Sequence, residues 1–204
     1  MEDALATLET AIGDIGMFRW WDQRFPRVAQ LEFGGVQLWA PPAPGQPPAA
    51  TLALSFVDPV SVSFLTRGES LPDDWPARLH RDELDPPDVS AEEITLRDAA
   101  YAAELIARAT RVDTVFGAPP GEVDWVAAPV KLVFWAGSAG AAIAAGSLNL
   151  VTHDGKVPLD EVPDAHARWW AYWREYWDRR DTADPLPKDW LCEVTIPILG
   201  SPPS

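Results

Sequence analysis

The side chains best suited to metal or acid-base chemistry lie in one short stretch, His80-Arg81-Asp82-Glu83-Leu84-Asp85. An imidazole beside carboxylates offers nitrogen and oxygen ligands to a divalent ion, so His80, Asp82 and Asp85 are candidate metal ligands. His80 and Asp82 are also candidate catalytic residues, because such neighbours can exchange protons. The spacing matches neither an EF-hand loop nor an H-E-x-x-H helix. A solvated acidic loop without metal or cofactor is therefore the favoured interpretation.

His166 lies in the most aromatic segment of the chain. The simplest interpretation is a hydrogen-bonded structural histidine, and the alternative is a general acid or base. His153 precedes Asp154-Gly155, a pair typical of turns, and adjacent side chains on a turn seldom converge on one centre. Cys192 falls on the apolar side of a predicted strand, which indicates a buried, unreactive thiol. No nucleophile-elbow, phosphate-loop or dinucleotide motif is present, and no segment resembles a known family.

Residues 162–180 predict a helix whose aromatic side chains share one face. At ~100° per residue the rings fall within an arc of about 160°, which His166 also shares. The rings belong to Trp169, Trp170, Tyr172, Trp173, Tyr176 and Trp177. Such a face offers on the order of 1,000 Å² for packing, so we expect it to cover the sheet as the main helix of the core. The alternatives are an aromatic-lined pocket or an interface, in which the binding residues would be Trp169, Trp170, Trp173, Trp177 and His166.

Hydrophobic periodicity predicts the elements that position these residues. Helical spacing is found at about 3–16 and 98–108, in addition to the aromatic helix. The Gly34-Gly35 pair predicts a hairpin turn within residues 31–39. Residues 141–152 are predicted as a strand, with a helix as the alternative. Alternating or continuous apolar runs predict further strands at 51–56, 60–64, 112–116, 130–136 and 190–196, with a turn at Asp58-Pro59 between the first two.

These elements predict a single α+β domain that spans residues 1–204. Because no β-α-β alternation runs through the chain, the sheet should be curved and mainly antiparallel, with about six to eight strands and three helices. Outside these elements, 41–50 is predicted to be a Pro-rich loop, 69–93 an acidic irregular segment and 198–204 a tail.

The chain carries a formal net charge of −15 over 204 residues. Such a charge repels phosphate backbones, which excludes a nucleic-acid reader. The uncharged stretch 132–152 is long enough to span a bilayer, but its glycines and polar residues argue against a membrane protein. The single cysteine and the acidic amino terminus, which lacks a secretory signal, predict a cytoplasmic protein. An excess of arginine over lysine is typical of a GC-rich bacterial genome.

The leading functional hypothesis is a non-enzymatic, acidic protein-interaction module, such as an inhibitor, an immunity-type protein or a regulatory binding protein. A field of this sign speeds encounter with a basic protein partner. One alternative is a small cytosolic hydrolase that uses His80 or His166 with neighbouring carboxylates. Another is a structural homo-oligomer that closes through the aromatic helix.

Overall fold

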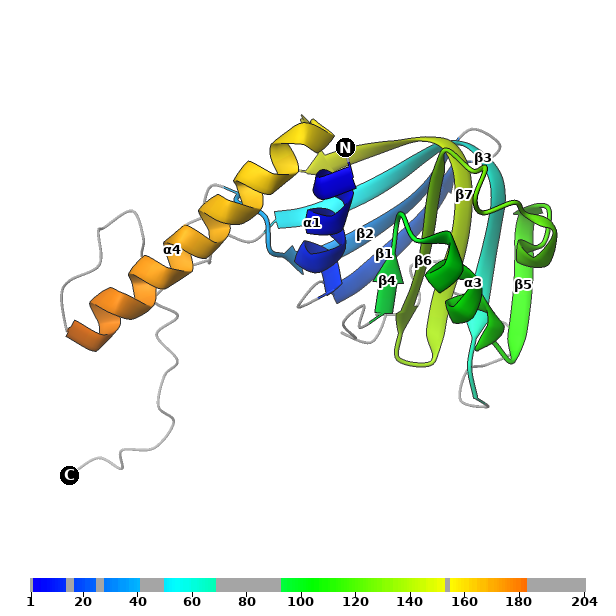
Figure 1. Ribbon diagram of the computed structural model, residues 1–204, viewed down its shortest axis with the longest axis horizontal. Helices are drawn as coiled ribbons and strands as arrows, with labels where there is room; N and C mark the ends of the chain where they lie inside the picture. Colours follow the sequence, from blue (N-terminus) through cyan, green and yellow to red (C-terminus); the bar gives the residue numbers. More distant parts are fainter. Residues whose placement is uncertain are drawn as a thin grey trace, which may run out of the picture.

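The computed structural model describes residues 2–13, 17–24, 28–40, 50–68, 93–152 and 155–182. Within these ranges, eight strands form one curled antiparallel sheet, accompanied by three α-helices (Figure 1). The strands are β1 (Met17–Arg24), β2 (Val28–Val36), β3 (Ala50–Thr66), β4 (Glu93–Thr95), β5 (Arg111–Gly117), β6 (Val130–Ala136), β7 (Ala139–Thr152) and β8 (Gly155–Val157). The helices are α1 (Glu2–Gly13), α3 (Ala99–Ala107) and α4 (Val162–Thr182), with short 3-10 turns η1 (Pro120–Glu122) and η2 (Leu159–Glu161). This architecture confirms the predicted α+β class.

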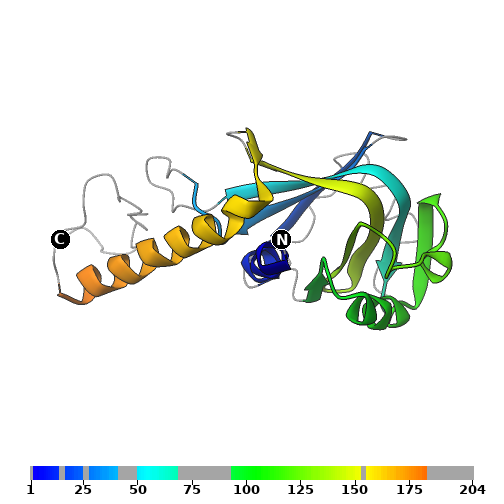
Figure 2. The same ribbon diagram turned by 45° about the horizontal axis from the view of Figure 1, so that its top comes forward.

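Strand β3 organises the sheet because three neighbours pair with it. Its first half pairs with β2 and its second half with β5, while β7 pairs along most of its other side. The sheet runs in the order β1-β2-β3-β7-β6-β4, and β8 pairs with the end of β7. Figure 2 shows that β3 and β7 bend strongly on the side of the molecule that carries α3 and β5.

The sequence predicted two strands separated by a turn at Asp58-Pro59, but β3 is continuous through this pair. Asp58 adopts a positive φ of 52°, and the register between β3 and β7 shifts between Pro59 and Ser61. Aspartate tolerates this left-handed conformation better than most residues, and proline lacks the N–H that a regular ladder would use. The pair therefore forms a bulge that bends the strand without reversing it. The predicted turn was wrong, although both strand segments were correct.

The predicted hairpin at Gly34-Gly35 was also wrong. Strand β2 runs through both glycines, and Phe33 pairs with Leu52 while Val36 pairs with Ala50. Gly35 has a φ of 70°, and the register shifts at this point. The glycine conformation thus produces a bulge within one strand. A bulge and a hairpin turn both use a residue with a positive φ, so the same glycine pair fits either structure.

The uniformly apolar run that was predicted as an internal strand forms β6, between β7 and β4. Its side chains alternate between two hydrophobic clusters: Leu132 and Phe134 belong to the larger one, and Val133 and Trp135 to the smaller one. The following segment, 139–152, is strand β7 rather than a helix. Burial on both faces explains why the sequence of β6 lacks polar alternation.

Helices α1 and α3 cover opposite faces of the sheet. Leu8 and Ile12 of α1 are fully buried in the larger cluster, whereas Leu105 of α3 is buried in the smaller one. The indole N–H of Trp135 donates a 3.0 Å hydrogen bond to the carbonyl of Leu105, which satisfies a buried donor. Helix α3 begins as predicted at Asp98, whose carboxylate accepts hydrogen bonds from the next turn.

Salt bridges are formed around the C-terminal end of α3. Arg108 forms ion pairs with Glu93 and Glu104, and Arg67 also pairs with Glu93 at 2.7 Å. The hydrogen bond from Arg108 to Glu104 is the main cause that raises the pKa of this guanidinium. Arg108 therefore stays charged at physiological pH.

Several predicted segments lie outside the described residues: most of the Pro-rich loop 41–50, most of the acidic segment 69–93, the strand 190–196 and the tail 198–204. The uncharged stretch 132–152 forms β6, β7 and the turn between them. None of the helices in the described ranges combines the length and the apolar character needed to cross a membrane.

Candidate functional site

Helix α4 is the most prominent element outside the sheet. It begins at Val162, directly after η2, and Pro163 occupies its first turn, where a missing N–H is harmless. The start of the helix lies near α1 and the sheet, whereas its second half extends past the edge of the sheet (Figures 1 and 2). An ion pair between Glu175 and Arg179, at 2.7 Å, supports this projecting half.

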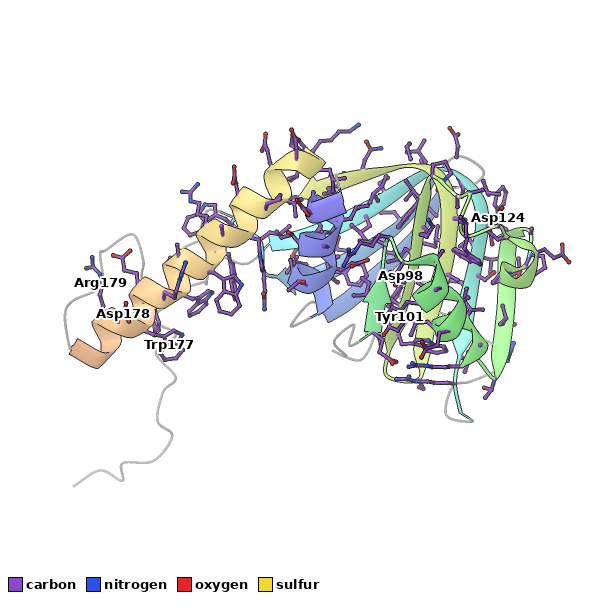
Figure 3. All side chains as sticks on the ribbon, in the orientation of Figure 1. Asp98, Tyr101, Asp124, Trp177, Asp178 and Arg179 are labelled. Carbon is purple, nitrogen blue, oxygen red and sulfur yellow. The ribbon has the colours of Figure 1, made fainter. Side chains whose placement is uncertain are left out.

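The aromatic face of α4 is buried along one side and exposed along the other. Tyr172 and Trp169 retain only 2% and 7% of their accessible surface, whereas Trp170 and Trp177 retain 42% and 48%. Trp173 lies between these two sets on the helical arc and is half-buried. We refer to Trp170 and Trp177 together as the exposed aromatic edge. Figure 3 shows Trp177 on the part of α4 that has left the sheet.

The rings of this face contact one another along the helix. The ring centroids of Trp169 and Trp170 are 5.0 Å apart with nearly perpendicular planes, and Trp169 and Trp173 are 5.9 Å apart. Trp173 stacks on Trp177 at 6.4 Å, and Tyr176 meets Trp177 edge-on at 5.2 Å. Aromatic pairs of these geometries contribute roughly 0.5–1.5 kcal/mol beyond area burial. The exposed rings are therefore held in place by their neighbours.

Trp39, which follows β2, joins α4 to the sheet. Its backbone N–H donates to the carbonyl of Ala165 at 3.1 Å, and its ring lies 5.8 Å from that of Tyr172. The guanidinium carbon of Arg168 lies 4.1 Å from the centroid of the Trp39 ring, a cation-π contact. Sequence reasoning did not assign Trp39 to this site, because nothing in the local pattern of 31–39 indicates contact with a helix more than a hundred residues later.

His166 connects the exposed aromatic edge to the sheet side. Its Nε2 lies 3.1 Å from the indole nitrogen of Trp170, which donates, and 3.3 Å from Oε1 of Gln37. The indole N–H requires an unprotonated Nε2, so this hydrogen bond selects the neutral Nδ1-H tautomer. Gln37 is itself 3% exposed and donates its backbone N–H to Ala11 of α1. In this tautomer Nε2 of His166 and Oε1 of Gln37 are both acceptors, so it is the hydrogen bond from the indole that fixes Trp170 on His166.

Two indole donors within the aromatic face lack an acceptor in the part of the chain that the structure describes. Nε1 of Trp169 and Nε1 of Trp173 are buried and have no hydrogen-bond acceptor among the described residues. A buried donor without an acceptor costs about 1–3 kcal/mol. Ring packing must therefore offset this cost within the cluster.

A groove opens beside the first turns of α4. Its volume is about 410 Å³, and it is lined by Trp39, Ala40, Thr152, Val157, Glu161, Asp164, Ala165 and Arg168. We call it the α4 groove. A second hollow of about 310 Å³ shares Val157 as a wall and is lined otherwise by Leu148, Asn149, Leu150, Lys156, Pro158 and Leu159. Charged and apolar side chains thus line both hollows, which share Val157.

The remaining candidates from the sequence, His80, Asp82 and Asp85, lie outside the described residues, as do His153 and Cys192. Among the side chains that the structure does describe, no three residues of the His, Cys, Asp or Glu type come together in a way that could hold a metal ion.

Comparisons of the chain with protein-family models, curated proteins and solved structures gave no significant match. The class is defined by the fold and by α4: an α+β protein with a curled antiparallel sheet and a projecting helix that carries an aromatic cluster.

Proposed function

We propose that this chain is a non-enzymatic protein-interaction module that binds a basic protein partner, as an inhibitor, an immunity-type protein or a regulatory binding protein does. The observation that carries the proposal is the exposed aromatic edge. Trp170 and Trp177 keep 42% and 48% of their surface on a helix that extends past the sheet. Tryptophan is among the residues most enriched at the energetic centres of protein interfaces.

The rigidity of this edge favours binding. Trp170 is fixed by its hydrogen bond to His166, and Trp177 packs between Trp173 and Tyr176. Side chains that are already ordered lose little conformational entropy when a partner arrives. The two half-exposed rings offer roughly 200 Å² of the ~800 Å² that each side of a standard interface buries, so they would form its centre.

The charge of the chain favours a basic partner over a second copy. Two molecules that each carry −15 repel one another, whereas a basic protein is attracted and approaches faster. This comparison supports the interaction module over the alternative of a homo-oligomer closed through α4.

Site-specific photo-crosslinking in extract from the host organism tests the proposal. A photoreactive phenylalanine analogue would replace Trp177 in one variant and Val126, which is 81% exposed, in a matched control. We expect one basic protein to be captured from position 177 and not from position 126. With that protein purified, Trp170→Ser together with Trp177→Ser should weaken binding at least about tenfold. Unchanged affinity of the double variant would refute the proposal.

A further inference from the structure

An arginine, Arg174, lies between the two tryptophans of the exposed aromatic edge. Trp170, Arg174 and Trp177 are spaced by four and then three residues, so at ~100° per residue they fall within about 60° of one another on α4. Arg174 is exposed, as both tryptophans are. Side chains at these spacings are neighbours on a helix, with Cβ atoms about 5–6 Å apart. The three side chains therefore form one continuous ridge along α4.

The guanidinium of Arg174 is bound at one end and open at the other. Its Nε donates to the carbonyl oxygen of Trp170, one turn earlier, at 3.4 Å. Its terminal nitrogens make no ion pair within the described ranges, although Asp178 lies one turn later. The adjacent carboxylate, Glu175, binds Arg179 instead. The fork of the guanidinium is thus available to a group from outside this part of the chain.

The other arginines whose side chains the structure describes each engage a partner. Ion pairs involve Arg67, Arg97, Arg108, Arg111 and Arg179, and a cation-π contact with Trp39 involves Arg168. Arginine and tryptophan are, with tyrosine, the residue types most enriched at the energetic centres of protein interfaces. An open guanidinium and two half-exposed indoles on one ridge therefore point to a ligand that carries an anionic group.

The two indoles determine how much an ion pair at Arg174 would contribute. An ion pair on an open surface contributes little, because water and salt screen it. When a partner covers Trp170 and Trp177, the rings exclude water from the guanidinium between them, and the same ion pair becomes stronger. The planar fork of arginine can then hold a carboxylate through two parallel N–H···O hydrogen bonds.

We propose that Arg174 binds the carboxylate of an aspartate or glutamate side chain of the partner, between Trp170 and Trp177. A phosphate also fits the fork, but its charge of about −2 is repelled more strongly by a chain with a net charge of −15. A protein that is basic overall can present one carboxylate and still be attracted. The assignment rests on the proposed function and deepens it, because it names the group that the partner places at the centre of the interface.

The test uses the partner that photo-crosslinking at position 177 captures, after its purification. Arg174→Gln should weaken binding at least about tenfold, mainly through faster dissociation. Arg174→Lys, which keeps the charge but loses the fork, should weaken it at least about threefold. The matched control is Arg179→Gln, the same change on the opposite side of α4 from Trp177 (Figure 3). This control should stay within about twofold of the wild-type affinity.

A double-mutant cycle identifies the carboxylate on the partner. Each aspartate and glutamate in the cross-linked region of the partner is changed to its amide and measured against wild type and against Arg174→Gln. We expect one such change whose effect on affinity is at least about fivefold smaller against Arg174→Gln than against wild type. Absence of any coupled side-chain carboxylate would overturn the assignment, as would coupling to the partner's C-terminus or to a phosphorylated residue.

Failure of this assignment is distinguishable from failure of the proposed function. Loss of partner binding in the Trp170/Trp177 variant, with full binding in Arg174→Gln, would leave the interaction module standing and refute the role of Arg174. Full binding in both variants, or no protein captured from position 177, would refute the proposed function itself and this assignment with it.

Discussion

The indole N–H of Trp170 donates a 3.1 Å hydrogen bond to Nε2 of His166, one turn earlier on α4. The bond links the exposed position of a candidate contact residue to the protonation of a histidine. It exists only while Nε2 carries a lone pair, so it is lost when the imidazole takes up a proton at this nitrogen.

We therefore expect the environment of the Trp170 indole to change when acidification places a proton on Nε2 of His166. Protonated Nε2 becomes a donor, so it turns to Oε1 of Gln37, at 3.3 Å, and the indole loses its acceptor. The measurement is the NMR signal of the Trp170 indole N–H, assigned with Trp170→Phe. In His166→Phe the same signal should not move with pH, and a pH-independent signal in the wild type would contradict the assignment.

Glu9→Ala should destabilise the protein by about 1–3 kcal/mol. The carboxylate of Glu9 accepts hydrogen bonds from the backbone N–H of Leu96 at 2.6 Å, from Thr95 and from Arg97. Since Leu96 is 3% exposed, alanine at position 9 leaves its N–H without an acceptor. Urea unfolding measures the loss. As a control, Glu175→Ala removes only a surface ion pair and should cost under about 1 kcal/mol; equal losses would show that Glu9 has no special role.

Among the tryptophans whose side chains the structure describes, Trp135 should be the one whose removal costs most stability. It is fully buried, donates to the carbonyl of Leu105 and carries the guanidinium of Arg67 at 5.0 Å from its ring. We expect Trp135→Ala to lower the free energy of unfolding by about 3–5 kcal/mol, the range for large buried aromatics. Trp177→Ala, at a 48% exposed position, should lower it by less than about 1 kcal/mol. A large loss at Trp177 would mean that this ring is structural and not a contact surface.

Gly117→Ala should be strongly destabilising, because a Cβ there would lie 1.9 Å from the carbonyl oxygen of Val60 and the φ is +70°. Gly68 separates the two causes, since its φ is +82° but nothing lies within 4 Å of its Cβ position. Gly68→Ala should thus show only the conformational cost, about 1–3 kcal/mol. Gly121→Ala has neither problem and should stay within about 0.5 kcal/mol of wild type. Thermal unfolding of the three variants should therefore rank them in this order.

Most of the sheet and all three helices could be predicted, because their signals are local. The apolar run of β6, the capping residue Asp98 and the aromatic periodicity of α4 each report directly on burial or helix geometry. The turns at Gly34-Gly35 and Asp58-Pro59 were wrong because a bulge and a turn need the same backbone conformations. Only pairing with distant strands decides between them.

The site was less predictable than the fold. The aromatic helix was identified from its periodicity. Periodicity does not reveal which residues lie beside each ring, so it could not show that Trp169 is buried and Trp170 exposed. The α4 groove depends on Trp39 and Asp164 coming together through the topology of the sheet. Contacts between residues so far apart in the chain produce no pattern in the local sequence around either residue.

The bulge at Asp58-Pro59 also restricts the register in which β3 can pair with β7. A strand that slides by one residue turns every side chain to the opposite face. Before the bulge β3 is held by β2 and after it by β5, while β7 follows both halves with a shifted register. A slip of β3 against β7 would have to move the irregularity as well, from a proline to a residue whose N–H belongs in the ladder. The irregularity at Asp58-Pro59 therefore helps to fix the alignment of β3 with β7.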